Sequence, residues 1–295
     1  MSAYHTPVLL QESITALSIR EDGVYVDATF GGGGHSREIL RRLGPDGRLI
    51  VFDKDEEALA NAPDDRRLTV VHNDFRFVHN FIRYHGYETV DGILADLGVS
   101  SHQFDTGQRG FSFRFENAPL DMRMNVRAVQ SAADIVNSYS GDELERIFRL
   151  YGELDNSRRL AELIVSERER GALRTTDDLG RAIAPVLPKF SEHKFLAKVY
   201  QALRIEVNGE MTSLEGFMKG AVRSLGQGGI LAVITYHSLE DRIVKNAIRE
   251  GCLQGRLRRV TKKPVLPSEE EISSNTRARS AKLRVAGKLP DEHER

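Results

Sequence analysis

Four consecutive glycines, Gly31 to Gly34, follow an apolar run directly and precede His35 and Ser36. A glycine run costs backbone entropy, so a folded chain keeps one where the backbone turns tightly or where another group approaches closely. A helix that starts just after such a turn presents backbone N–H groups to a ligand. The stretch therefore predicts a ligand-binding turn between a strand and a helix.

Acidic residues end the next three apolar runs: Asp53 ends the second, Asp74 with Phe75 the third, and Asp96 the fourth. A carboxylate about 20 residues after a glycine turn accepts hydrogen bonds from both hydroxyls of a ribose, in a dinucleotide or in an S-adenosyl ligand. Asp74 and Phe75 suit the amino group and the ring face of an adenine. Together these residues predict a site for a nucleoside-containing ligand.

Short apolar runs bounded by turn residues and separated by helix-like stretches read as buried parallel strands in βαβ units. We expect strands within 24–30, 48–55, 68–75, 90–101 and 230–238. Two terminal runs, 257–266 and 281–287, have no helix-like stretch between them and are expected to form an antiparallel pair. The predicted fold is α/β, with five parallel strands and a closing hairpin, a closure usual in S-adenosylmethionine methyltransferases.

The strand rhythm stops between residues 106 and 208, where the stretches read as amphipathic helices. One of them opens with Ser140 and has Glu143 three residues on, which is a capping-box pattern. We therefore expect a discontinuous ligand-binding domain, 1–105 with 209–295, and an inserted helical domain, 106–208, that recognises the substrate.

Each signal has a simpler interpretation when it is taken alone. The glycines suit a plain tight turn, Asp53 suits the N-cap of the following helix, and His35 suits a hydrogen-bonded position at a helix start. The glycine spacing also misses the third glycine of the G-x-G-x-x-G fingerprint. This mismatch and the closing hairpin argue against a nucleotide-dependent oxidoreductase, and the acids argue against a non-catalytic RNA-binding protein.

Seven motifs, in this order and over almost the whole chain, resemble the bacterial 16S ribosomal RNA cytosine-N4 methyltransferase family. They are YHTPVLLQE, DATFGGGGHS, DLGVSS, RGFSFR, PLDMRM, YHSLEDR and NTRARSAKLR. The resemblance implies a Rossmann-like class I methyltransferase sheet. It also implies methyl transfer from S-adenosyl-L-methionine to the exocyclic amine of a cytosine in the decoding region of small-subunit RNA. The cofactor contacts that it implies fall on Gly33, Gly34, His35, Asp53, Phe75, Asp96 and Gln103.

The exocyclic nitrogen of cytosine is a poor nucleophile because its lone pair is delocalised into the ring. A nearby acceptor that takes its proton would help, and Asp96 at the end of the fourth strand is the best-placed carboxylate. The prolines and aromatic of the DNA amino-methyltransferase motif are missing after Asp96, so a role toward the cofactor stays open. Tyr236 is expected to stack on the base and His237 to move a proton, whereas Ser238 suits the cap of the next helix.

Charge is distributed unevenly along this chain of net charge −1. Residues 245–288 hold twelve basic and four acidic residues, which is typical of a surface that faces phosphates.

The segment RGFSFRF has two interpretations. Its arginines and aromatics suit single-stranded RNA, and its alternation suits a half-buried strand, which we favour. Met122 and Met124 suit a lid or a core.

The composition indicates the cellular compartment in which this protein works. The single cysteine, Cys252, excludes an intrachain disulfide and a cysteine metal cage, and fits a reducing compartment. The N-terminus lacks a basic leader with an apolar core, and no window approaches 18 apolar residues, so we expect no signal peptide and no membrane span. The expected partner is 16S ribosomal RNA within the small subunit, in the cytoplasm. The sequence leaves monomer and dimer open.

Overall fold

The computed structural model describes residues 7–290, so the start of the YHTPVLLQE motif, residues 4–6, lies outside the described part of the chain. The chain divides into two compact units. We call Met1–Gly98 together with Met211–Arg295 the sheet unit, and Val99–Glu210 the helical unit. The helical unit spans the segment in which the strand rhythm stops.

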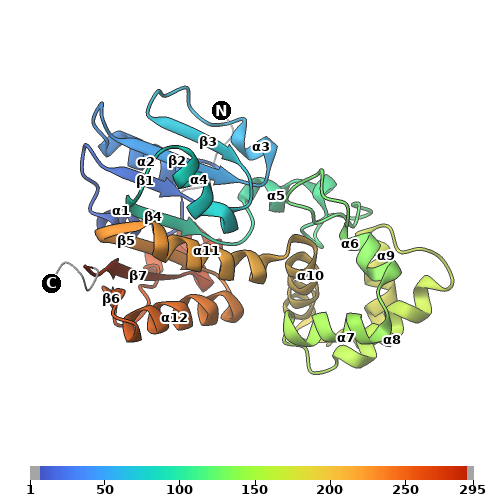
Figure 1. The fold of residues 1–295 in the computed structure, drawn as a ribbon. Helices are drawn as coiled ribbons and strands as arrows, with labels where there is room; N and C mark the ends of the chain where they lie inside the picture. Colours follow the sequence, from blue (N-terminus) through green and yellow to red (C-terminus); the bar gives the residue numbers. More distant parts are fainter. Residues whose placement is uncertain (1–6, 291–295) are drawn as a thin grey trace. The chain divides into compact units, whose positions relative to one another are not determined.

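The sheet unit is built on one seven-stranded sheet with the order β3-β2-β1-β4-β5-β7-β6 (Figure 1). The strands are β1 (Val24–Asp27), β2 (Arg48–Asp53), β3 (Leu68–His72), β4 (Val90–Asp96), β5 (Leu225–Thr235), β6 (Leu257–Arg259) and β7 (Lys282–Lys288). The first five are parallel, and β7 pairs antiparallel with both β5 and β6. This topology confirms the α/β prediction, and the strand order reverses beside β1, where such sheets bind ligands.

Both faces of the sheet are covered, which is why its strands are almost continuously apolar. Ile50 and Phe52 of β2 face a core shared with α4, α11 and α12, whereas Leu49 and Val51 face a core shared with α1 and α2. The helices of this unit are α1 (Leu10–Leu17), α2 (Gly34–Arg42), α3 (Glu56–Leu59), α4 (Val78–Tyr84), α11 (Glu210–Ser224), α12 (Ser238–Leu253) and α13 (Glu269–Ser274), with 3₁₀ turns η1 (Phe75–Phe77) and η4 (Thr276–Ser280).

Strand β5 differs from the prediction at both ends. It begins at Leu225 rather than at residue 230, because Leu225 pairs with Val90 before an irregularity in the ladder restores pairing at Gly92 with Ile230. Gly226, Gly228 and Gly229 lie in this irregular part, and Gly228 has a left-handed φ of 76°. The strand ends at Thr235, so the three residues that follow it are free of the ladder.

The two terminal strands pair antiparallel as expected, but the segment between them is not free of helix. It contains α13 and η4. Ser268 caps α13 by accepting a hydrogen bond from the N–H of Glu271, and Asn275 caps η4 in the same way. These elements are only five or six residues long, too short for a periodic apolar pattern to reveal.

The helical unit has its own apolar core, formed by residues such as Phe148, Ile164 and Leu203. Its helices are α5 (Ser101–Asp105), α6 (Ala132–Ser138), α7 (Gly141–Leu150), α8 (Ser157–Arg168), α9 (Thr176–Ile183) and α10 (Glu192–Asn208), with 3₁₀ turns η2 (Gly107–Arg109) and η3 (Ala184–Val186). The capping box of Ser140 and Glu143 opens α7 as predicted.

The favoured strand at RGFSFRF is wrong, because residues 110–116 form turns and irregular backbone. The alternation reflects packing of single side chains: Phe111 is buried in the core, and Phe113 packs edge-on against Tyr200. Arg114 is exposed and its guanidinium lies 5.1 Å from the ring centroid of Phe104. Met122 is buried in the same core, which supports its structural interpretation.

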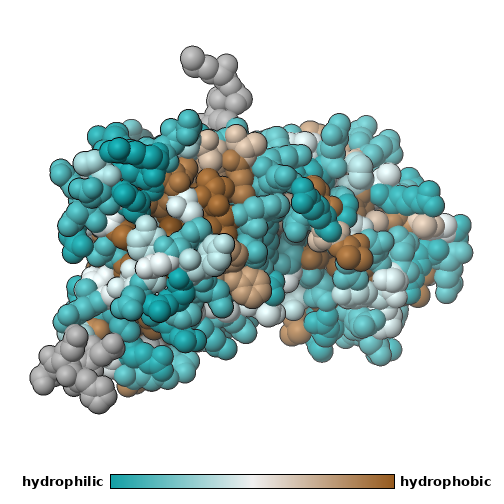
Figure 2. Space-filling model, turned by 45° about the horizontal axis from the view of Figure 1, so that its top comes forward, coloured by the Kyte–Doolittle hydropathy of each residue, from teal (hydrophilic) through white to brown (hydrophobic). Residues whose placement is uncertain are grey.

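The surface in view in Figure 2 is largely hydrophilic, with hydrophobic side chains in separate patches. Within residues 7–290, no helix combines the length and the apolar character needed to cross a membrane.

Candidate functional site

The glycine run forms a tight turn between β1 and α2. Gly31 and Gly33 have left-handed φ values of 50° and 73°, and Gly33 directly precedes the helix. A Cβ on Gly33 would lie 2.7 Å from the ring of Phe30, and a Cβ on Gly34 would lie 2.1 Å from Pro7. Backbone conformation therefore favours glycine at positions 31 and 33, and the close approach of the protein's own side chains favours it at positions 33 and 34.

Asp53 ties this turn to the end of β2. Its Oδ2 accepts a hydrogen bond of 2.8 Å from the N–H of Gly31, and its Oδ1 accepts one of 2.9 Å from the N–H of Asp55. Burial raises the pKa of this carboxyl to about 6 despite these bonds. Asp55, and not Asp53, caps α3, so the N-cap interpretation of Asp53 is wrong. The remaining lone pairs of Asp53 suit the hydroxyls of a ribose.

Asp74 and Phe75 follow β3, but Asp74 is already committed to protein partners. Its Oδ2 lies 2.8 Å from Lys54 Nζ and 2.7 Å from the Arg76 guanidinium, and it accepts a hydrogen bond of 2.8 Å from the Ser213 hydroxyl. Burial opposes ionisation, yet these cations keep the pKa of Asp74 below its usual value. Phe75 is half-buried and packs edge-on against Phe217, which fixes its ring beside the site.

Asp96, at the end of β4, is held from both sides. Its backbone N–H donates a 2.6 Å hydrogen bond to Thr29 Oγ1, and its Oδ1 accepts one of 2.6 Å from the Tyr236 hydroxyl. Burial raises the pKa of Asp96 to about 7, and the hydrogen bond from Tyr236 acts in the opposite direction. Near neutral pH this carboxyl can therefore both release and accept a proton.

His35, on the first turn of α2, faces Asp96 with its Nδ1 3.8 Å from Oδ2. Its Nε2 lies 3.2 Å from the carbonyl oxygen of Val8, and because a carbonyl only accepts, Nε2 carries the proton. Burial lowers the pKa of His35 to about 4, so the ring is neutral at neutral pH. The interpretation of His35 as a hydrogen-bonded histidine at a helix start agrees with this geometry.

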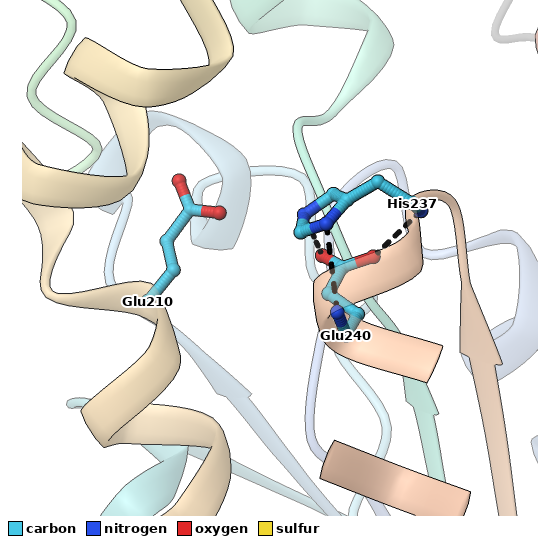
Figure 3. A group of neighbouring side chains, drawn as sticks. All are labelled: Glu210, His237 and Glu240. Carbon is cyan, nitrogen blue, oxygen red and sulfur yellow. Dashed lines mark hydrogen bonds and ion pairs between the residues drawn. The ribbon is translucent and has the colours of Figure 1, made fainter. Parts of the chain in front are cut away.

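Tyr236 and His237 follow β5 at the same edge of the sheet. His237, and not Ser238, is the N-cap of α12: its Nδ1 accepts from the N–H of Glu240 at 3.5 Å. The Glu240 carboxylate accepts in return from the N–H of Tyr236 at 2.8 Å. It also lies 3.1 Å from His237 Nε2 (Figure 3). The helix start is thus organised by a buried carboxylate, and it fixes the backbone from which the Tyr236 phenol reaches Asp96.

Gln103 stands apart from the other predicted residues because it belongs to the helical unit. It is buried in α5, where its side chain accepts a hydrogen bond from the N–H of Ser100 and completes a capping box. The other predicted residues all lie in the sheet unit, at the ends of successive parallel strands or on the turns and helix starts that follow them.

Sequence reasoning missed Asp27, the last residue of β1. Its side chain is 1% exposed and accepts hydrogen bonds from the Ser36 hydroxyl at 2.6 Å and the Thr29 N–H at 3.1 Å. Burial raises its pKa to about 7. The available signal was position: Asp27 ends its strand as Asp53 and Asp96 end theirs, so three acids share one edge of the sheet.

A family model described as the MraW methylase family matches residues 2–289. A protein of Parabacteroides distasonis named "Ribosomal RNA small subunit methyltransferase H" is 53% identical, over 98% of this chain and 98% of its own. A protein of Bacteroides thetaiotaomicron with the same name is 54% identical over 97% of each chain. Among solved structures, an rRNA methylase from Streptococcus thermophilus aligns with 95% of this chain and 95% of its own, at 12% identity and a TM-score of 0.41.

Proposed function

This chain belongs to the MraW methylase family, and we propose that it transfers a methyl group from S-adenosylmethionine to the N4 amine of a cytidine in the decoding region of 16S ribosomal RNA. The observation that carries this proposal is identity of about half the residues, over nearly the full length of both chains, to proteins named as small-subunit rRNA methyltransferases. The sheet order, with its antiparallel β7, is that expected for such an enzyme.

The donor set at the strand ends fits S-adenosylmethionine. Asp53 offers acceptor oxygens for ribose hydroxyls, Phe75 an aromatic ring for an adenine, and the glycine turn follows β1 with Gly34 only partly buried. We propose Gly33, Gly34, Asp53 and Phe75, with His35, Asp96 and Gln103, as the cofactor contacts. When bound, S-adenosylmethionine supplies an electrophilic methyl group on a sulfonium.

Asp96 is the residue we propose as the proton acceptor for the cytidine amine. Its carboxyl titrates near neutral pH, and the Tyr236 hydroxyl and the Thr29 side chain fix its position. His237 is the second proposed catalytic residue, and its ring already caps α12. Because methyl transfer is an in-line displacement, positioning supplies most of the catalysis.

The proposed setting follows from the substrate. The partner is 16S ribosomal RNA within the small ribosomal subunit, which places the reaction in the bacterial cytoplasm. The helical unit is the proposed substrate-recognition part, with its own core and its own capped helices.

The direct test of the proposed function is mass spectrometry of nucleosides. Purified protein is incubated with 16S rRNA or with small subunits and with S-adenosylmethionine carrying a labelled methyl group. We expect labelled N4-methylcytidine. Calorimetry should show binding of S-adenosylmethionine and none of NAD; binding of NAD alone would favour an oxidoreductase.

Replacing Asp53 by alanine should weaken binding of S-adenosylmethionine about 10- to 150-fold, as expected for loss of a hydrogen bond to a charged group, about 1.5–3 kcal/mol. Calorimetry measures the effect, and Asp46→Ala removes an exposed acid of the same unit as the control. Asp53 also holds the turn through Gly31, so the 2′-deoxy analogue of S-adenosylhomocysteine separates the two roles. Asp53→Ala should weaken binding of that analogue less; an equal loss would mean that Asp53 acts only on the turn.

A further inference from the structure

The outer edge of the sheet is formed by β6 and the segment that continues it, residues 256–265, which we call the edge segment. Leu257 pairs with Lys288, and further along Val265 exchanges backbone hydrogen bonds of 2.8 and 2.9 Å with Leu283. At the neighbouring position Lys282 pairs with Thr235, the last residue of β5. The edge segment therefore runs alongside β7 and reaches the carboxyl ends of the parallel strands, where the site lies.

The edge segment carries a dense row of basic side chains, all of them exposed. They are Arg256, Arg258, Arg259, Lys262 and Lys263. In the part of the chain that the structure describes, none of the five forms an ion pair or a side-chain hydrogen bond. Their charges are available to a partner.

Some arginines of the same unit are neutralised locally, whereas the five cations of the edge segment are not. Arg67 lies 2.6 Å from Asp65, and Arg284 of the adjacent strand lies 2.7 Å from Asp241. The acids of the C-terminal region do not compensate the row. Three of the four acids in residues 245–288 lie in the first turn of α13, where Glu271 accepts a hydrogen bond from the N–H of Leu9, and the fourth, Glu250, lies in α12.

The side chain of Arg258 lies opposite a glycine, which leaves space for its guanidinium. Its β6 position faces Gly287 of β7, and a Cβ on that glycine would lie 3.3 Å from the guanidinium carbon. The guanidinium therefore lies over the backbone of β7 at Gly287. A Cβ at position 287 would require the guanidinium to shift by a few tenths of an ångström.

Basic residues on an edge strand also prevent pairing with another chain. One or two charges are enough to prevent such pairing on a strand as short as β6. The basic residues continue beyond the end of β6, at Lys262 and Lys263. Five unpaired cations within eight residues can contact several of the regularly spaced phosphates of a nucleic-acid backbone.

We propose that the edge segment binds the phosphate backbone of the RNA substrate where that RNA runs alongside the site. This inference rests on the proposed function and adds a surface outside the helical unit to it. Since each lost phosphate contact removes released counterions, such a surface makes binding depend on salt, by about 0.7 to 0.9 in the slope of log K against log salt per contact.

The test replaces Arg258, Arg259, Lys262 and Lys263 by glutamine and measures binding of transcribed 16S rRNA over a range of KCl concentrations. We expect affinity at low salt to fall at least tenfold and the slope to fall by about 1 to 3. The control replaces the same number of exposed cations elsewhere in the sheet unit, Arg66, Arg83, Lys219 and Arg223, by glutamine. It should leave the slope nearly unchanged.

Two double variants, Arg258 with Arg259 and Lys262 with Lys263 replaced by glutamine, keep the inference testable if the fourfold variant does not fold. Unchanged affinity for S-adenosylmethionine shows that each variant is folded. If the edge variants keep the slope of the control, the cations only protect the edge and the inference is wrong. Nucleoside mass spectrometry separates this failure from failure of the proposed function. A wild-type protein that makes no N4-methylcytidine refutes the function, whereas an edge variant that methylates and binds normally refutes only the inference.

Discussion

Deleting residues 110–205 and joining the ends with a short flexible linker should abolish methyl transfer to RNA while S-adenosylmethionine still binds within about tenfold. The deletion keeps α5 and Gln103, and it keeps the whole seven-stranded sheet with the residues at its strand ends. The sheet unit has cores on both faces, built from its own residues, so it is expected to fold without the deleted helices.

The helical unit has surface features suited to unpaired RNA. Phe190 is 101% exposed and lies between Lys189 and Lys194, which are also exposed, and Arg114 is exposed over the ring of Phe104. An exposed aromatic ring stacks on a base, and neighbouring cations contact phosphates. A cytidine that must leave its stack for the reaction costs less to extrude from a loop than from a duplex. We therefore propose that this unit selects an unpaired target.

Calorimetry and nucleoside mass spectrometry on the deleted protein check this prediction. A single-residue variant, Phe190→Ala in the full chain, tests the same surface: it should weaken RNA binding by about 1–3 kcal/mol and leave cofactor affinity unchanged. If the deleted protein still methylates the original cytidine, the helical unit does not select the substrate. Recognition would then fall to the edge segment.

The strand pattern could be predicted because each strand is buried on both faces, so its apolar run is continuous and ends at a polar residue. Asp53 and Asp96 were found for this reason: each is the first polar residue after such a run. Asp27 follows the same rule, but the interpretation of this stretch rested on the glycine run that begins at Gly31, and Asp27 was missed. Position at a strand end was a better guide than the glycine motif.

Two local features could not be predicted from the sequence, because each depends on contacts with particular side chains. His237 caps α12 because Glu240 reaches back to the preceding backbone N–H groups, and a serine in the next position offered an equally good pattern. The aromatic alternation at Phe111 and Phe113 resembles a strand, but these rings pack into a helical core from irregular backbone. In both cases tertiary partners decided between two locally acceptable structures.

Replacing Asp96 by asparagine should lower kcat by a factor of about 10² to 10⁴, the range for loss of a positioned proton acceptor. In the wild-type protein, burial holds the pKa of Asp96 near 7 and the carboxylate form is the active one. The rate should therefore rise with pH, be half-maximal near pH 7 and level off above about pH 8. The Asp96→Asn protein should lose this dependence, and its S-adenosylmethionine affinity, measured separately, shows how much Asp96 serves the cofactor.

Tyr236→Phe should move the pH profile to higher values by about 1 to 2 units while keeping the ring. The phenol donates a 2.6 Å hydrogen bond to Asp96 that stabilises the carboxylate, so its removal raises the pKa of Asp96 further. At pH 7 fewer molecules then carry the active form, and at pH 9 the rate should recover to at least about half of its maximum. Tyr84→Phe, at an 80% exposed tyrosine of the same unit, is the control.

The alanine variant at position 236 separates positioning from stacking. Tyr236→Ala removes the hydroxyl and the ring, so any loss of kcat at pH 9 beyond that of Tyr236→Phe measures stacking on the cytidine. If Tyr236→Phe keeps the wild-type pH profile and only Tyr236→Ala loses activity, the tyrosine acts on the base and Asp96 is not the group that titrates. If both variants shift the profile equally and recover at pH 9, the hydroxyl acts through Asp96 alone, because the ring then contributes nothing that the hydrogen bond does not.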